Sequence, residues 1–279
     1  MNKLSLDRQA QIIKVLCEGN SIRSTARITR TAINTVVNVL KDAGDACAKY
    51  QDIHLRNLPC KTIQCDEIWS FCYAKQKNVP ENKQGRFGFG DVWTWTAIDA
   101  DTKLVPSWSV GLRDAGYAFE FIRDLQSRLA NRVQLTTDGY KAYLNVIDDV
   151  FGTDIDYAML VKIYGTEPAG AGRYSPAKCT GVNHRTVMGH PDPKLISTSY
   201  SERQNLTMRM NMRRFTRLTN AFSKKIENHI YAIALYFMHY NFVRPHKTLS
   251  KPYPKTPAMA AGVTNHVWTA EDIVRLISK

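Results

Sequence analysis

The stretch TIQCDEIWSFCY, residues Thr62 to Tyr73, combines β-branched and aromatic residues with one short polar interruption. This composition predicts a strand that is buried on both faces. Asp66 lies inside it, and an ionised carboxylate in a buried strand is costly unless a cation or hydrogen bonds compensate it. The stretch therefore predicts both the start of a sheet and a carboxylate that needs a partner.

Strand and helix signals alternate after this stretch. The turn Asp99-Ala100-Asp101-Thr102 separates two strand-like runs and indicates a hairpin. Asp114 is placed to cap a helix with an apolar stripe. In chain order we predict strands over 92–99 and 103–110, a helix from Asp114, a strand over 133–137 that ends at Asp138, a helix from about Tyr140, a strand over 155–164, a long loop rich in Gly, Pro and Ser to Ser199, and a helix from near Ser201.

Three antiparallel strands followed by helix, strand, helix, strand and helix make an α/β layout with one mixed sheet and flanking helices. This is the ribonuclease H-like order. It places a carboxylate in the middle of the first strand beside one at the end of the fourth, and a later helix can bring a third. The candidates for a catalytic, metal-binding triad are Asp66, Asp138 and Glu202.

Three carboxylates suit two hard divalent cations, which prefer oxygen ligands, so we predict two Mg²⁺ ions per site, with Mn²⁺ as a substitute. Such ions promote in-line displacement at phosphorus. Taken singly, Asp138 is also explained as a turn former, Glu202 as an acid favoured at a helix start and Asp66 as an ion-pair partner. Strand alternation predicts that Glu67 points to the face opposite Asp66 and stays out of the site.

The first fifty residues show the order and spacing of a helix-turn-helix domain. Helical signals cover 6–18, 21–28 and 30–44, and Gly44 is a natural end for the third helix. Its inward stripe is Ile33, Val36, Val37 and Leu40, so the outer face of a DNA-recognition helix is predicted to carry Thr31, Asn34, Thr35 and Asn38, with Arg23, Arg27 and Arg30 near phosphates. An ordinary three-helix bundle shows the same stripes.

The predicted domains are a helix-turn-helix domain over 1–50, a linker over 51–61, a ribonuclease H-like catalytic domain over 62–250 and a C-terminal tail over 251–279. Residues 45–61 have weak periodicity, which fits a linker or a short connecting helix. The N-terminal sequence lacks the apolar stretch of a secretory signal, and the longest apolar run, Ile230 to Met238, is too short to cross a bilayer. We therefore expect a cytoplasmic protein without a membrane partner.

Charge indicates a polyanionic partner. The 38 Lys and Arg residues against 25 Asp and Glu residues give a net charge of +13, and residues 201–279 alone carry 13 basic and 4 acidic groups. A basic helix face beside Glu202 is predicted to bind DNA through Arg203, Arg209, Arg213, Arg214 and Arg217. A solvated charged face is the alternative. The six cysteines contain no Cys-x-x-Cys pair, which argues against a zinc ribbon or a redox motif.

Several segments resemble the DDE transposases of bacterial insertion sequences, most closely the insertion sequence 1 type. They are QCDEIWSF, TTDGYKAY, YSERQNLTMRMNMRRFTRLTNAFSK, YNFVRPHKTL and TPAMAAG, and they extend over most of residues 60–265. The resemblance implies that Asp66, Asp138 and Glu202 bind the metals of an enzyme that cuts DNA ends and joins them to target DNA. One departure is the lack of the four-cysteine zinc finger that related proteins often carry.

This resemblance implies double-stranded DNA as the partner, both as element ends and as target, and a homo-oligomer that holds two ends together at the bacterial nucleoid. Two alternatives stay open: a non-enzymatic DNA-binding regulator derived from a transposase, and a metal-dependent nuclease of the same fold. Further candidates for the neighbourhood of the site are Asn241, Arg244, His246, His184 and Arg185.

Overall fold

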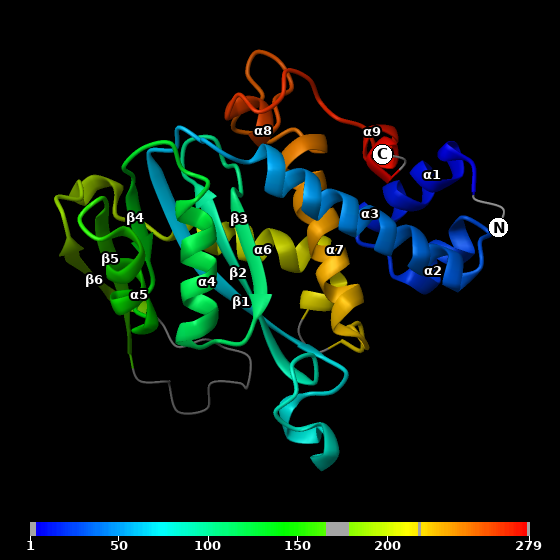
Figure 1. The fold of residues 1–279 in the computed structure, drawn as a ribbon, viewed down its shortest axis with the longest axis horizontal. Coiled ribbons are helices and arrows are strands. Elements are labelled where there is room, and N and C mark those ends of the chain that lie inside the picture. The colour runs from blue at the N-terminus through cyan, green and yellow to red at the C-terminus, as the bar shows by residue number, and fades with distance from the viewer. Residues whose placement is uncertain (1–3, 166–178, 217–218, 278–279) are drawn as a thin grey trace.

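The computed structural model describes residues 4–165, 179–216 and 219–277, and its centre is a six-stranded sheet in the order β3-β2-β1-β4-β5-β6 (Figure 1). β1, β2 and β3 pair antiparallel, β4 lies parallel to both β1 and β5, and β6 is antiparallel to β5. The mixed sheet confirms the predicted ribonuclease H-like α/β order. The strands are β1 (Thr62–Cys72), β2 (Gly90–Asp99), β3 (Ser107–Gly111), β4 (Gln134–Thr137), β5 (Asp156–Tyr164) and β6 (Cys179–Met188).

β6 differs from the prediction, which placed a long loop between Tyr164 and Ser199. Within the described residues it is the edge strand next to β5, and most of its residues are exposed. A strand without a buried face has no apolar alternation, so its sequence carries no periodic signal. A 3₁₀ turn (Pro193–Leu195) follows it, and residues 166–178 of the predicted loop lie outside the described residues.

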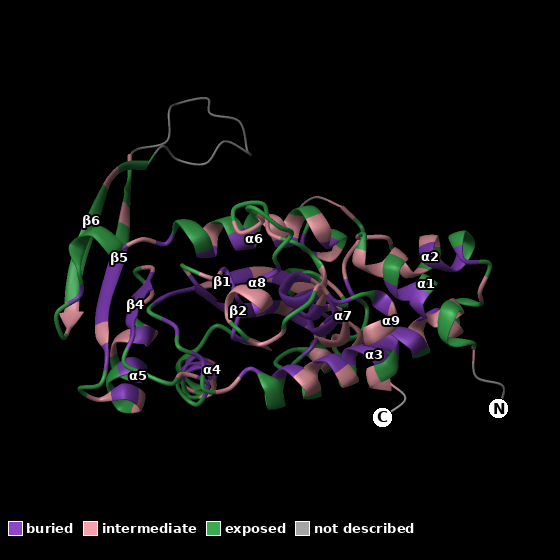
Figure 2. Ribbon diagram, turned by 90° about the horizontal axis from the view of Figure 1, so that it is seen from above, coloured by how far each residue is buried: buried purple, intermediate pink, exposed green. Residues whose placement is uncertain are grey.

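Helices cover both faces of the sheet (Figure 2). α4 (Ala115–Gln126) and α5 (Ala142–Phe151) cover one face, and α6 (Ser199–Asn211) covers the other. α7 (Ile226–Met238) packs on α3, and its Ile233 and Phe237 share a buried cluster with Ile68 of β1. As predicted, the Asp114 side chain caps α4 by accepting a hydrogen bond from the Tyr117 N–H. α7 continues as a π-helical turn (His239–Val243). None of the helices within the described ranges has both the length and the apolarity that a membrane crossing requires.

The N-terminal helices are α1 (Leu6–Cys17), α2 (Ile22–Ile28) and α3 (Ile33–His54). α3 does not end at Gly44: it continues for ten more residues to His54, into the first four residues of the linker predicted over 51–61, and packs on α7. Gly44 lies where the two helices cross, because a Cβ there would come within 2.5 Å of the Tyr231 Cβ. The glycine therefore marks a close helix approach and not a helix end. Ile33, predicted to face inward, is 49% exposed.

The residues predicted as a C-terminal tail contain α8 (Pro257–Ala260) and α9 (Ala270–Ile277). α9 packs against α1 and α3, and its Ile273 and Val274 are buried in the main hydrophobic core. This packing was not apparent from the sequence. The division into domains at residues 50, 61 and 250 stays a prediction.

A buried histidine links α7 to the sheet. The His229 Nε2 lies 3.2 Å from the Ser70 Oγ and its Nδ1 lies 3.0 Å from the Ser223 Oγ. Because Ser70 already donates to the Val92 carbonyl and Arg214 donates to Ser223, the pattern fits a neutral ring with the proton on Nε2. Burial, followed by the nearby Arg214 charge, lowers the pKa of His229 to about 3.

The His229 environment predicts an acid-sensitive fold. Its folded-state pKa is depressed below the unfolded value of about 6.5, so the unfolded chain takes up a proton first and stability is lost as pH falls from about 6.5 towards 3. At pH 4.5 the loss from this group is about 2 to 3 kcal/mol. Urea unfolding at pH 7.0 and 4.5 should show a pH-dependent loss that is smaller by this amount in His229→Gln. Equal losses in both proteins would contradict the assignment.

Candidate active site

Asp66 is held on the α6 side of β1. Its Oδ1 accepts a hydrogen bond from the Glu67 backbone N–H at 2.8 Å, and its Oδ2 accepts one from the Asn205 side-chain amide of α6 at 2.8 Å. Burial is the main cause that raises the pKa of Asp66 to about 7, and the charges of Asp138 and Glu202 add to it. The charge that the sequence predicted to need compensation therefore has two hydrogen-bond donors, and no Lys or Arg side chain among the described residues forms an ion pair with it.

Asp138 directly follows β4, the parallel neighbour of β1. The pairing of Gln64 with Thr136 places residue 138 beside residue 66 where β4 ends. The Asp138 Oδ1 accepts a hydrogen bond from the Tyr140 N–H at 2.9 Å, which fixes the carboxylate across the turn. The structure thus brings together the first two carboxylates of the predicted triad.

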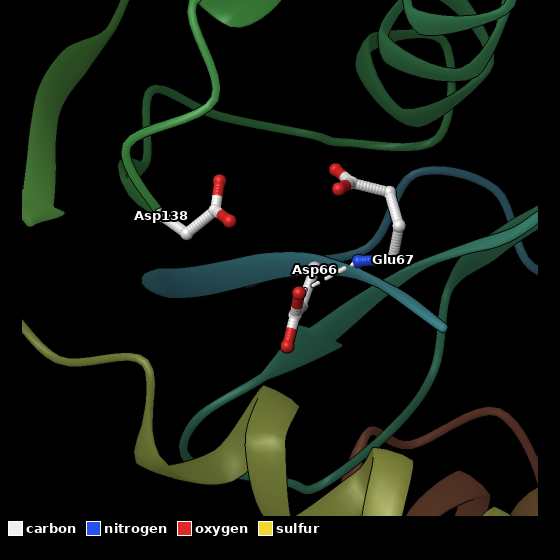
Figure 3. Close-up of side chains that lie close together, drawn as sticks. All are labelled: Asp66, Glu67 and Asp138. Carbon is white, nitrogen blue, oxygen red and sulfur yellow. Dashed lines mark hydrogen bonds between the residues drawn. The ribbon is translucent and has the colours of Figure 1, made fainter. Parts of the chain in front are cut away.

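Glu67 joins these two residues, contrary to the prediction. One carboxylate oxygen from each of Asp66, Glu67 and Asp138 lies within 4.8 Å of the others, although Asp66 and Glu67 leave β1 on opposite sides (Figure 3). Alternation along the strand is correct, but β4 ends at Thr137 while β1 continues, so that edge of β1 is open beyond residue 66. Side chains from both faces reach this open edge, which a rule based on strand faces alone does not capture.

Glu67 is tied to the far side of the site. Its side chain is 1% exposed; one carboxylate oxygen accepts a hydrogen bond from the Tyr143 hydroxyl and the other accepts one from the Arg113 Nε at 3.1 Å. Burial raises the pKa of Glu67 to about 7, with further increases from Asp138 and Asp66. These bonds occupy both oxygens of Glu67, as the bonds from the Glu67 N–H and the Asn205 amide do for Asp66.

Arg113, for which no sequence pattern provides a signal, connects the carboxylates. It follows β3 and precedes the helix cap Asp114, and its guanidinium lies 3.7 Å from the Asp138 Oδ2 as well as contacting Glu67. The guanidinium stacks over the rings of Trp93 and Tyr140, at 4.8 and 4.1 Å from their centroids. Arg113 is therefore a fixed positive charge at the edge of the carboxylate cluster.

Glu202 lies in the first turn of α6 but outside this cluster. Its Oε1 forms an ion pair of 2.5 Å with the Lys162 ammonium of β5 and accepts a hydrogen bond from the Thr198 hydroxyl. Its charge contributes to the raised pKa of Asp66, so it is a neighbour of the site. The side chains of Lys162 and Glu202 are 32% and 42% exposed, and an ion pair this open contributes little stability. Replacing the Lys162 ammonium by another cation as the partner of Glu202 would therefore cost little folding free energy.

The donor set fits a hard divalent cation. The clustered ligands are carboxylate oxygens, which Mg²⁺ and Mn²⁺ prefer. In addition, the Asn205 Oδ1 beside Asp66 is buried and has no hydrogen-bond partner within the described residues. The orphaned amide oxygen offers a further oxygen ligand, and the carboxylate cluster, which Arg113 contacts at Glu67 and Asp138, leaves negative charge that a cation would offset.

Most predicted DNA-facing residues of the N-terminal helices are accessible. Thr31 and Thr35 are half-buried, and the Thr31 hydroxyl accepts a hydrogen bond from Arg8 at 3.3 Å. The exposed ones are Arg23, Arg27, Arg30, Asn34 and Asn38. The turn between α2 and α3 thus carries polar and basic side chains at the surface, and their role in DNA binding stays a prediction.

The predicted basic face beside Glu202 is smaller in the structure. Arg203 and Arg213 are exposed and Arg209 is half-buried. Arg214 is turned inward: its guanidinium donates to the Ser223 Oγ at 2.9 Å and to the Asn228 carbonyl at 3.0 Å, which removes it from the DNA-facing set. It follows the end of α6, where the chain leaves the helix and the helical face no longer applies. Arg217 lies outside the described residues.

The structure also gives the positions of the five further residues that the sequence suggested for the neighbourhood of the site. Asn241 is buried and bonds both the N–H and the carbonyl of Val105, so it is a structural residue and not part of the site. Arg244 donates to the Asn211 side chain at the end of α6, and His246 pairs with Thr248. His184 and Arg185 are exposed on β6.

Three solved transposase structures are similar to parts of this chain. A pre-cleavage Mos1 transpososome matches at 11% identity over 56% of this chain, with a TM-score of 0.22. A Mos1 mariner paired end complex with Mn matches at 10% identity over 85% of this chain and 77% of that chain, with a TM-score of 0.31. A piggyBac transposase synaptic complex with hairpin DNA matches at 11% identity over 95% of this chain and 57% of that chain, with a TM-score of 0.34. This chain spans 60% of the length of the first of these. No family model and no curated protein matches the sequence.

Proposed function

We propose that this chain is a DNA transposase that cuts element ends and joins them to target DNA by metal-dependent phosphoryl transfer. The observation that carries the proposal is the placement of Asp66 and Asp138 side by side on neighbouring parallel strands of a ribonuclease H-like sheet, with carboxylate oxygens within 4.8 Å. The segments QCDEIWSF and TTDGYKAY, which contain these two residues, resemble transposases of the insertion sequence 1 type and support a transposase of that type. A homo-oligomer is proposed because two DNA ends must be held together.

In this proposal Asp66, Asp138 and Glu202 hold two Mg²⁺ or Mn²⁺ ions. When bound, these ions supply Lewis acidity to the scissile phosphate and to the attacking hydroxyl. Glu202 would serve as a ligand if its ion pair with Lys162 opened, and Asn205 orients Asp66 through the existing hydrogen bond. Glu67 keeps Arg113 beside Asp138, where the guanidinium offsets the charge of the DNA phosphate.

End recognition is proposed for the turn between α2 and α3. The exposed Asn34 near the start of α3 is placed to contact base edges and Arg27 to contact a phosphate. We expect Asn34→Ala to weaken binding to the element's own end by about tenfold, the size of one base-edge interaction, and to leave binding to an unrelated duplex unchanged. Fluorescence anisotropy on both duplexes measures this. An equal loss on both, or no loss, would contradict a base-reading role.

Joined products distinguish the transposase from its two alternatives. A labelled duplex with the gene's own flank is incubated with a supercoiled plasmid, the protein and Mn²⁺. Covalent transfer of the label to the plasmid supports a transposase, cleavage without transfer supports a nuclease of the same fold, and binding without either supports a regulator.

A further inference from the structure

The segment between β1 and β2, residues 73–89, forms an arm that projects from the end of the two strands (Figure 1). It is ordered by its own contacts. Two 3₁₀ turns, Gln76–Asn78 and Glu81–Lys83, lie in it, and the Gln76 side chain accepts a hydrogen bond from the Asp91 N–H at 3.0 Å. The Lys83 ammonium lies 4.1 Å from the ring centroid of Tyr73 and 5.0 Å from that of Phe89.

The base of the arm is fixed to the chain before α7. The Tyr73 N–H donates to the Ser223 carbonyl at 2.8 Å, and the rings of Phe71 and Phe222 are 4.8 Å apart. Gly88 lies so close to Ile226 that a Cβ there would come within 2.7 Å of its side chain. These contacts set the direction in which the arm points from the sheet.

The arm exposes basic side chains to solvent. Lys75, Lys77 and Arg86 are exposed, and none of them forms an ion pair with any residue that the structure describes. Glu81 is the one acidic residue of the segment. Lys224 and Lys225, next to Ser223 at the base, are exposed as well. The arm and its base therefore form a positive surface that internal acids do not neutralise.

A strip of half-buried aromatic rings connects this surface to the carboxylates. Trp69 and Trp93 lie opposite each other in the β1–β2 ladder, and Trp69 and Phe71 share the strand face of Glu67. Arg113, beside Asp138, stacks on Trp93. Cys72, at the end of β1, is six residue steps along the strand from Asp66, which is about 20 Å. Rings interleaved with cations fit nucleic acid better than an apolar protein partner.

We propose that the arm of residues 73–89 binds the phosphate backbone of double-stranded DNA through Lys75, Lys77 and Arg86, which lie beyond the end of β1 that is about 20 Å from Asp66. This inference rests on the proposed function of the carboxylate site in DNA cleavage. The contact is sequence-independent, because it is made to phosphates and comes from long, flexible side chains. It holds the DNA in register with the site, while α2 and α3 select the sequence.

The test uses the full-length protein in which Lys75, Lys77 and Arg86 are all changed to Gln. Binding of a fluorescein-labelled duplex of arbitrary sequence, about three helical turns long, is measured by anisotropy across a KCl series. We expect affinity to fall about tenfold or more, and the slope of log K against log salt to decrease by about 0.9 for each phosphate that the variant no longer neutralises. The control changes Lys49, Arg123 and Arg275 to Gln, which removes the same charge from exposed residues that already pair with acids on their own helices.

An arm variant that binds like the wild type would overturn this inference alone, whereas a wild type that does not bind duplex DNA would contradict the proposed function as well. Equal losses in the arm variant and the control would show an effect of net charge and overturn the assignment. The arm could instead contact a second subunit, and sedimentation of both variants tests this alternative. If the arm variant loses an oligomer that the control keeps, the arm is a subunit contact and not a DNA contact.

Discussion

Asp66→Asn is expected to reduce metal-dependent DNA strand cleavage by about 1,000-fold or more, the size seen when one member of a catalytic unit is removed. The amide keeps the shape of the carboxylate but removes a negative charge from the cluster with Glu67 and Asp138. DNA affinity should stay within about twofold, because the residues proposed to contact DNA lie elsewhere. Single-turnover nicking of a labelled duplex with Mn²⁺ measures the cleavage rate.

Asp148→Asn is the matched control, since Asp148 is exposed on α5, away from the cluster, and this variant should cleave like the wild type. Thermal unfolding of the metal-free Asp66→Asn variant shows whether a loss of cleavage results from misfolding. Because burial and the neighbouring charges disfavour ionised Asp66, the Asp66→Asn variant is expected to melt at a higher temperature than the metal-free wild type. Cleavage by Asp66→Asn within about tenfold of the wild-type rate would remove Asp66 from the mechanism.

Gly44→Ala is expected to destabilise the fold by about 2 to 3 kcal/mol, although alanine favours a helix. The new Cβ would lie 2.5 Å from the Tyr231 Cβ and 2.6 Å from its Cα, so α3 and α7 must move apart and pack less tightly along their interface. Backbone atoms of Tyr231 cannot move aside as a flexible side chain does. The free energy of unfolding in urea measures the effect.

Gly116→Ala tests the same substitution at a position with space. Gly116 is in α4, and a Cβ there meets nothing closer than the Asp114 Oδ1 at 3.4 Å. We expect a neutral or slightly stabilising change, because the helix gains a residue with less backbone freedom in the unfolded chain. If Gly44→Ala were as mild as Gly116→Ala, the close approach of α3 and α7 would be wrong.

The contrast between these glycines shows where sequence reasoning succeeds and where it stops. The order of strands and helices from Thr62 to Asn211, apart from the edge strand β6, was predictable, because alternation, apolar stripes and the Asp114 cap are local signals. The length of α3 was not, because Gly44 has the composition of a helix end and its role depends on Tyr231, 187 positions later. The packing of α9 on α1 likewise depends on contacts that no local pattern encodes.

The same limit applies to the candidate site. Asp66 and Asp138 were predictable from strand order alone, since neighbouring parallel strands bring their ends together. Glu67 was excluded by strand alternation, which does not account for the open edge beyond the end of β4. Arg113 has no sequence signal except a position just before a helix cap, and only the fold shows that it reaches Glu67 and Asp138.

A Mn²⁺ titration followed by electron paramagnetic resonance, on the wild type and Asp138→Asn side by side, tests most directly whether this carboxylate cluster is a metal centre. We predict saturable loss of the free-ion signal with the wild type and weaker binding by about tenfold or more with Asp138→Asn, because the variant lacks one of the charged oxygen ligands. Equal Mn²⁺ binding by the two proteins would contradict a metal centre at Asp66 and Asp138, and with it the proposed DNA chemistry.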